Sequence, residues 1–157
     1  MWTTWKTVTV GTFADVHTLQ KALIDSGFRI GTWAEDVLNS PNFTISPQQR
    51  EINLVRVTPQ DLGFPSGALR TAIYKKGLEF GLSLCPLEVG PQLRLQYSDQ
   101  PRLESLQIGM EPQLDSEGHE SEFRVVHGGD DFLWLVGDHK HPNGFWMGDE
   151  YFIFVKK

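Results

Sequence analysis

The sequence is poor in cysteine, in positive charge and in long apolar runs. A single cysteine among 157 residues excludes an internal disulfide and a multi-cysteine zinc site. No stretch approaches the roughly 18 consecutive apolar residues of a membrane-spanning helix. Residues 1–6 also lack the basic and apolar regions of a signal peptide. We therefore expect a soluble, cytoplasmic protein that does not contact membranes.

Positive charge is outnumbered, with 14 Lys and Arg against 20 Asp and Glu and a formal net charge of -6. Residues 1–100 hold nine basic and nine acidic side chains, so the whole excess lies in residues 101–157. An acidic surface repels phosphate backbones, which argues against nucleic-acid binding and favours a cation or a basic protein as partner. The alternative is that acidic turns only keep an aromatic-rich sheet soluble.

The composition is otherwise that of a globular protein, with 39% hydrophobic and 22% charged residues. A chain of this length forms one domain by the usual size range and buries a core without disulfide or metal support. We therefore expect a single domain over residues 1–157.

Helix and strand patterns alternate in the first half of the chain. The helix patterns have apolar residues at helical spacing between a capping residue and a stop, such as Thr12 and Gly27, or a capping box at Thr32. The strands are β-branched and alternating. The predicted elements are a strand at 6–10, helices at about 12–27, 32–38 and 66–80, and a strand at 52–57.

The second half predicts a β-meander and no helix after Leu84. Turn-forming residues at 115–118, 128–130 and 142–144 separate short strand patterns. Two of the segments, 132–136 and 151–155, are apolar on both faces and should be covered on both sides. The predicted strands are 93–97, 106–110, 123–126, 132–136 and 151–155. The fold class is thus α+β: about three helices packed over one face of a curved antiparallel sheet or small barrel, with a C-terminal β-meander.

Residues 84–101 read LCPLEVGPQLRLQYSDQP. This block resembles one that recurs in a family of small uncharacterised bacterial proteins. The likeness continues through Gly109-Met110-Glu111-Pro112, residues 123–135 and the C-terminal residues 152–156, and it departs at Glu117, where the family pattern usually has Asp. The resemblance covers nearly the whole chain and implies no activity.

The same block holds the densest group of polar candidates, Glu88, Arg94, Gln96 and Asp99. In a strand at 93–97, Arg94 and Gln96 share one face. Arginine suits two-point recognition of a carboxylate or phosphate, and glutamine offers a donor and an acceptor beside it. The group is either a polar binding site or a structural one, with Arg94 in an internal salt bridge to Glu88.

Aromatic residues gather late in the chain, where Trp134 and Trp146 are candidate walls of a binding site. Exposed tryptophan beside Asp, Asn and Gln is typical of sugar platforms and of protein interfaces, whereas buried tryptophan is ordinary core. Trp146 lies between glycine turns, so we expect it to be the more exposed of the two.

Three further features favour structural interpretations. Cys85, between Leu84 and Pro86, resembles a small buried apolar residue more than an activated nucleophile. His139 and His141 lack an evident third ligand, and Asp115-Ser116-Glu117-Gly118 is too short for a calcium loop. We expect no metal and no cofactor.

Common enzyme signatures are missing, including phosphate-binding and dinucleotide loops and a nucleophile elbow. The leading hypothesis is a non-enzymatic binding or interaction domain for a small ligand or a protein partner. It uses Glu88, Arg94, Gln96 and Asp99 beside Trp134 or Trp146. One alternative is a small hydrolase or isomerase with Glu88 or Asp99 as general base. Another is an acidic inhibitor or immunity-type protein for a basic partner.

Overall fold

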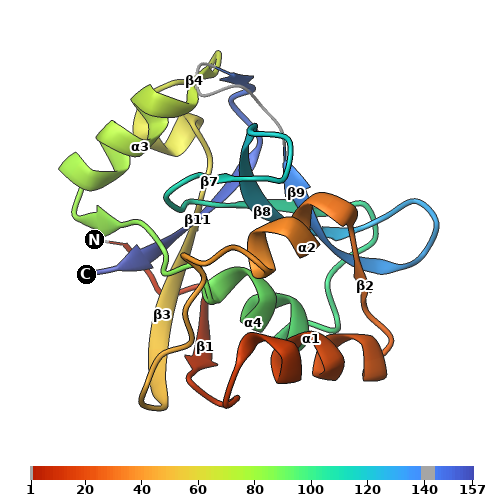
Figure 1. The fold of residues 1–157 in the computed structure, drawn as a ribbon. Helices are drawn as coiled ribbons and strands as arrows, with labels where there is room; N and C mark the ends of the chain where they lie inside the picture. The colour runs from red at the N-terminus through yellow and green to blue at the C-terminus, as the bar shows by residue number, and fades with distance from the viewer. Residues whose placement is uncertain (1, 139–143) are drawn as a thin grey trace.

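A computed structural model describes residues 2–138 and 144–157, which form a curled sheet with helices on both faces (Figure 1). The helices of this part are α1 (Val16–Asp25), α2 (Thr32–Leu38), α3 (Arg70–Glu79), α4 (Val89–Gln96) and a 3-10 turn η1 (Gln60–Leu62). Its strands are β1 (Lys6–Val10), β2 (Arg29–Ile30), β3 (Arg50–Val57), β4 (Ala68–Leu69), β5 (Leu82–Ser83), β6 (Ser105–Ile108), β7 (Gln113–Leu114), β8 (Glu120–His127), β9 (Leu133–Asp138), β10 (Phe145–Trp146) and β11 (Tyr151–Lys156).

The main sheet is mixed, with the strand order β1-β3-β11-β6-β8-β9-β2. Its pairs are antiparallel except β11 with β6 and β2 with β9. The expectation of a purely antiparallel sheet is wrong because the C-terminal strand β11 inserts between β3 and β6 instead of extending the meander. Strands β6, β8 and β9 do form the antiparallel part of the expected C-terminal meander.

Side chains on opposite faces of the sheet enter two cores. Along β11, Ile153 belongs to the larger core, which α1, α2 and α4 cover, whereas Phe152 and Phe154 belong to a second core under α3. In Figure 1, α3 accordingly lies apart from the other three helices. The prediction that residues 151–155 are covered on both faces is confirmed, whereas the expected packing of all helices over one face is wrong.

Helix α4 replaces the strand predicted at residues 93–97. Proline is tolerated in the first turn of a helix, where Pro91 lies. Gly90 lets the helix approach β8 closely, because a Cβ atom there would lie 2.5 Å from the Phe123 ring. Leu93 and Tyr97, which are four residues apart, also share one face of a helix, so tertiary packing decides between the two structures.

The other predicted elements agree with the structure to within a few residues. The strand at 6–10 and the helix at 32–38 have the predicted bounds. Helix α1 starts later than expected because Asp15, whose side chain accepts from the Thr18 N–H, is its N-cap. The hydroxyl of Thr12, the expected cap, instead accepts a hydrogen bond from Gln92 on α4.

No helix in the described ranges has the length and apolar character needed to cross a bilayer.

Candidate functional site

The four polar residues that the sequence singled out do not meet at a common site. Arg94 is 0% exposed, and its guanidinium donates to Gln100 Oε1 (2.7 Å) and to the carbonyl oxygens of Tyr97 (2.6 Å) and Val126 (3.1 Å). Burial lowers the pKa of Arg94 to about 10. Its side chain faces the core because α4 is a helix and not a strand.

Glu88 joins separate segments of the chain. Its buried carboxylate accepts from the backbone N–H of Gly11 (2.7 Å) and Ser46 (2.8 Å) and from the side chain of Gln92 (3.0 Å). In the described part of the chain it forms no ion pair with Arg94. The predicted Arg94–Glu88 salt bridge is therefore wrong, although both residues have structural contacts.

The other two polar candidates lie on the surface. Gln96 is exposed, and its amide both donates to the Thr9 carbonyl (2.8 Å) and accepts from the Thr9 N–H (3.0 Å). Asp99 is exposed just after α4. Neither shares a hydrogen bond with Arg94 in the described ranges.

Trp134 belongs to an aromatic group at the β2 end of the sheet. Its indole donates to Asp130 (3.1 Å), and the Arg29 guanidinium lies 3.5 Å from the Phe132 ring centroid and 5.8 Å from that of Trp134. Together with Ile24 and Phe28, Trp134 borders a surface groove. This group is separate from Trp146, so the two tryptophans do not form one wall.

Trp146 is buried, with 2% of its surface exposed, and the expectation that it is the more exposed tryptophan is wrong. Its ring packs edge-on against Phe152 at 5.0 Å between centroids, and the Arg124 guanidinium lies 5.1 Å from it. The glycine after it, at position 148, serves close packing, because a Cβ there would lie 2.2 Å from the Pro65 carbonyl oxygen.

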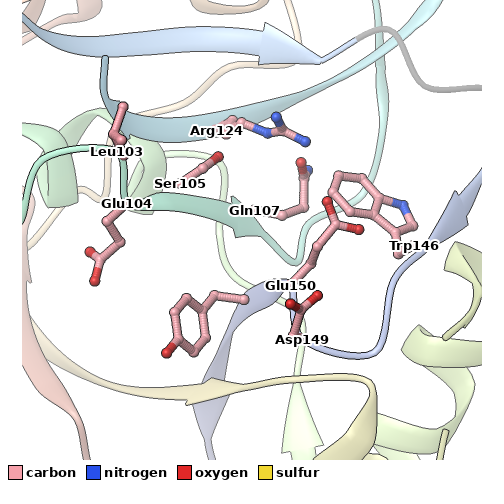
Figure 2. Close-up of a pocket in the computed structure, with 9 residues that line it drawn as sticks. Leu103, Glu104, Ser105, Gln107, Arg124, Trp146, Asp149 and Glu150 are labelled. Atoms are coloured by element: carbon pink, nitrogen blue, oxygen red, sulfur yellow. The ribbon is translucent and has the colours of Figure 1, made fainter. Parts of the chain in front are cut away.

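Trp146 nevertheless lines an open pocket of about 290 Å³, which we call the Trp146 pocket (Figure 2). The pocket lies where β6, β8, β10 and the start of β11 meet. The turn before β11 is closed by Glu150, whose carboxylate accepts from the Met147 N–H at 2.7 Å. Its lining residues are Leu103, Glu104, Ser105, Gln107, Arg124, Trp146, Asp149, Glu150 and Tyr151.

Two neighbouring polar side chains, Gln107 and Arg124, form the floor. They are directly opposite each other in the antiparallel pair β6–β8, so their side chains are neighbours on one face of the sheet. Gln107 Oε1 and Arg124 Nε are both buried without a hydrogen-bond partner among the described residues.

Negative charge exceeds positive charge around the pocket. Glu104 is paired with Arg56 (3.0 Å) and Arg124 with Asp138 (3.3 Å). In Figure 2 the Glu104 carboxylate points away from Arg124 and Trp146. Asp149 and Glu150 form no ion pair within the described ranges. The local excess of negative charge therefore comes from Asp149 and Glu150.

A buried polar network, which the sequence analysis does not predict, lies behind the floor. The Glu122 carboxylate accepts hydrogen bonds from Arg70 and Tyr74 of α3 and from Gln107 Nε2 (3.2 Å). Burial raises the pKa of Glu122 to about 7, since lost hydration outweighs the stabilisation by Tyr74 and Arg70. Burial also raises the pKa of Tyr74. The alternation of Glu120, Glu122 and Arg124 along the strand was the available signal.

The remaining sequence candidates have structural surroundings or fall outside the structure. Cys85 is buried, its thiol donates to the Ile153 carbonyl (3.5 Å), and burial raises its pKa. Asp115 Oδ1 accepts from the N–H groups of Glu117 and His119, both at 2.9 Å, as in an ordinary turn. His139 and His141 lie outside the described residues.

Within residues 2–138 and 144–157, no group of three or more His, Cys, Asp or Glu side chains is arranged to hold a metal ion.

Comparisons of the chain with protein-family models, curated proteins and solved structures gave no match. The resemblance of residues 84–101 to a bacterial family therefore remains an expectation.

Proposed function

We propose that this chain is a binding domain whose Trp146 pocket holds a basic segment of a partner protein. The observation that supports this proposal most directly is the pair of carboxylates at the mouth, Asp149 and Glu150, which have no cationic partner among the described residues. Beside them is the ring of Tyr151, a residue that is 37% exposed. Carboxylates next to aromatic rings attract a lysine or arginine side chain by ionic and cation–π interactions.

The surroundings of the mouth strengthen this attraction. Protein walls lower the local dielectric constant, so a charge pair in a pocket interacts more strongly than one on an open surface. Leu103, which lines the same pocket, is 67% exposed and offers apolar contact to the aliphatic part of a bound side chain. The acidic excess of residues 101–157 adds long-range attraction for a basic partner.

The main competing function is a small hydrolase or isomerase, and the raised pKa of Glu122 is the observation that favours it. A general base must come within hydrogen-bond reach of its substrate. Glu122 does not line the Trp146 pocket, because Gln107 stands between them, and its oxygens accept from Arg70, Tyr74 and Gln107. Its position therefore supports a structural tie to α3 more than catalysis.

Fluorescence anisotropy with a labelled decapeptide of alternating lysine and asparagine tests the proposal. We expect salt-sensitive binding that the double variant Asp149→Asn/Glu150→Gln weakens about tenfold, the combined effect of two partly exposed ion pairs. A decapeptide of alternating glutamate and asparagine should not bind.

The matched control is Asp99→Asn/Glu51→Gln, which removes the same charge from two exposed carboxylates outside the pocket. It should keep most of the affinity. Equal losses in both double variants would mean that net charge alone attracts the peptide, and the pocket would not be its site.

A further inference from the structure

A surface groove lies at the β2 end of the sheet, apart from the Trp146 pocket. It has a volume of about 440 Å³ and is bordered by Ile24 of α1, Glu35 of α2, Arg29 of β2 and Trp134 of β9. In Figure 1, β2 runs along the outer edge of the molecule between α1 and α2. Strand β2 is also the last strand in the order of the main sheet.

Exposed apolar side chains surround this groove. Ile24, in the last turn of α1, is 62% exposed. Phe132 is 40% exposed, and the Arg29 guanidinium lies over both its ring and that of Trp134. Large apolar side chains and an arginine gathered around a hollow are typical of a protein interface. Because the exposed Ile24 stands directly beside the hollow, the surface is complementary in shape to a copy of itself.

Contacts within the chain hold the aromatic border in place. The Trp134 indole donates to Asp130 (3.1 Å), and the Arg29 guanidinium lies 3.5 Å from the centroid of the Phe132 ring. Side chains that are ordered before association lose less conformational entropy when a partner binds. This part of the surface is therefore prepared for a protein contact.

The charges that line the groove restrict the partner. Arg29 and Glu35 are both exposed, and neither forms an ion pair within the described ranges. A partner surface of a single sign would repel one of them, and an apolar surface would bury both without a counter-charge. A second copy carries one charge of each sign with the same spacing. Around a two-fold axis, Arg29 of each copy faces Glu35 of the other.

We propose that the groove between α1 and α2 is the interface of a symmetric homodimer. In this dimer Ile24 of each copy enters the groove of the other, and two reciprocal ion pairs between Arg29 and Glu35 flank the apolar contact. The inference goes beyond the proposed function, because it concerns a surface separate from the Trp146 pocket.

Sedimentation equilibrium at protein concentrations from about 1 μM to about 1 mM, a range that includes weak association, tests the proposal. We expect a reversible monomer–dimer equilibrium. Ile24→Glu should weaken it at least about tenfold, because it places a charge in the apolar contact. Since Ile24 is 62% exposed, the substitution should leave the fold intact. A monomer at every concentration, or unchanged dimerisation of Ile24→Glu, would overturn the proposal.

Charge reversal tests the reciprocal ion pairs. Arg29→Glu and Glu35→Arg each create two like-charge contacts in the dimer, so each variant alone should dimerise about tenfold more weakly. An equal mixture of the two should recover the wild-type affinity, because a dimer with one copy of each variant has two opposite-charge contacts. A mixture that remains monomeric would rule out this pairing.

The control for net charge is Lys75→Glu, which makes the same charge change as Arg29→Glu at an exposed residue of α3 outside the groove. It should dimerise like wild type. Equal weakening in Lys75→Glu and Arg29→Glu would mean that general repulsion between copies, and not the groove, controls association.

An NMR dilution series of the ¹⁵N-labelled protein locates the interface. The indole resonance of Trp134 should shift with protein concentration, whereas that of Trp146 should stay constant. Concentration-dependent shifts at Trp146 with Trp134 unchanged would place the contact between copies in the Trp146 pocket and overturn the assignment.

Discussion

Buried polar side chains beside and within α4 connect segments that are distant in the sequence. Arg94 links α4 to β8 and to Gln100, and Glu88 links it to the loops at Gly11 and Ser46. Each group replaces its lost hydration with several hydrogen bonds, which is the condition under which burial of a polar group is tolerated. These contacts predict that Arg94 and Glu88 stabilise the fold.

Arg94→Met should lower the free energy of unfolding by about 2–4 kcal/mol, because each buried acceptor that loses its donor costs roughly 1–3 kcal/mol. Urea denaturation measures this loss. Asp99→Asn, an exposed change three residues after α4, should stay within about 0.5 kcal/mol of wild type. If Arg94→Met and wild type have the same midpoint of urea denaturation, the buried contacts of Arg94 do not stabilise the fold.

Among the secondary-structure elements, α3 and α4 approach the sheet in different ways. Helix α4 packs closely on β8 through Gly90, and its Gln96 amide pairs with both backbone groups of Thr9 on the edge strand β1. Pairing of this kind satisfies the open hydrogen-bonding groups of a sheet edge. Helix α3 is instead held to the sheet by the buried contacts of Arg70 and Tyr74 with Glu122.

Gly90→Ala should destabilise the protein by about 1–3 kcal/mol, the usual cost of overpacking a core. The added methyl group would lie 2.5–2.8 Å from Phe123 atoms, and Phe123 is fully buried. Thermal denaturation of Gly90→Ala, Phe123→Leu and the double variant measures the coupling. The double variant should lose less than the sum of the two single losses, whereas strict additivity would place the strain elsewhere.

The raised pKa of Glu122 predicts that the free energy of unfolding decreases as the pH rises. Its pKa is raised from 4.5 to about 7 in the folded protein, so the folded state binds more protons than the unfolded state between these values. Its contribution is fully present below about pH 4.5 and is lost as pH rises through about 7, by roughly 3 kcal/mol at most. The groups that face Glu122 are Arg70, Tyr74, Gln107 and, at longer range, Asp138.

The measurement for Glu122 is the difference in unfolding free energy between wild type and Glu122→Gln at several pH values from 4.5 to 8. The free energy of unfolding of wild type relative to that of the variant should fall as the pH rises and should level off above pH 7. A constant difference across this range would mean that Glu122 does not titrate differently on folding.

At the level of the whole molecule, the sequence predicts most elements but not the way they meet. Alternation at residues 6–10, the capping box at Thr32 and the apolar segment at 151–155 predict local structure correctly. The short alternation at 93–97 does not, because the helix there depends on the contact of Gly90 with the distant Phe123.

The Trp146 pocket was beyond prediction for the same reason. Only Trp146, of the six candidate residues, lies in it. Its floor depends on the pairing of Gln107 with Arg124, and its mouth on the insertion of β11 beside β6. The glycine at position 148 suggested a turn that exposes Trp146, whereas it allows the chain to pack against Pro65.

The most direct test of the account is an NMR titration of the ¹⁵N-labelled protein with the lysine–asparagine decapeptide, followed at the tryptophan indole resonances. Binding in the Trp146 pocket predicts saturable shifts at Trp146, with little change at Trp134 in the separate groove. A saturable shift at Trp134 with Trp146 unchanged would contradict it and would place the binding surface at the β2 end of the sheet.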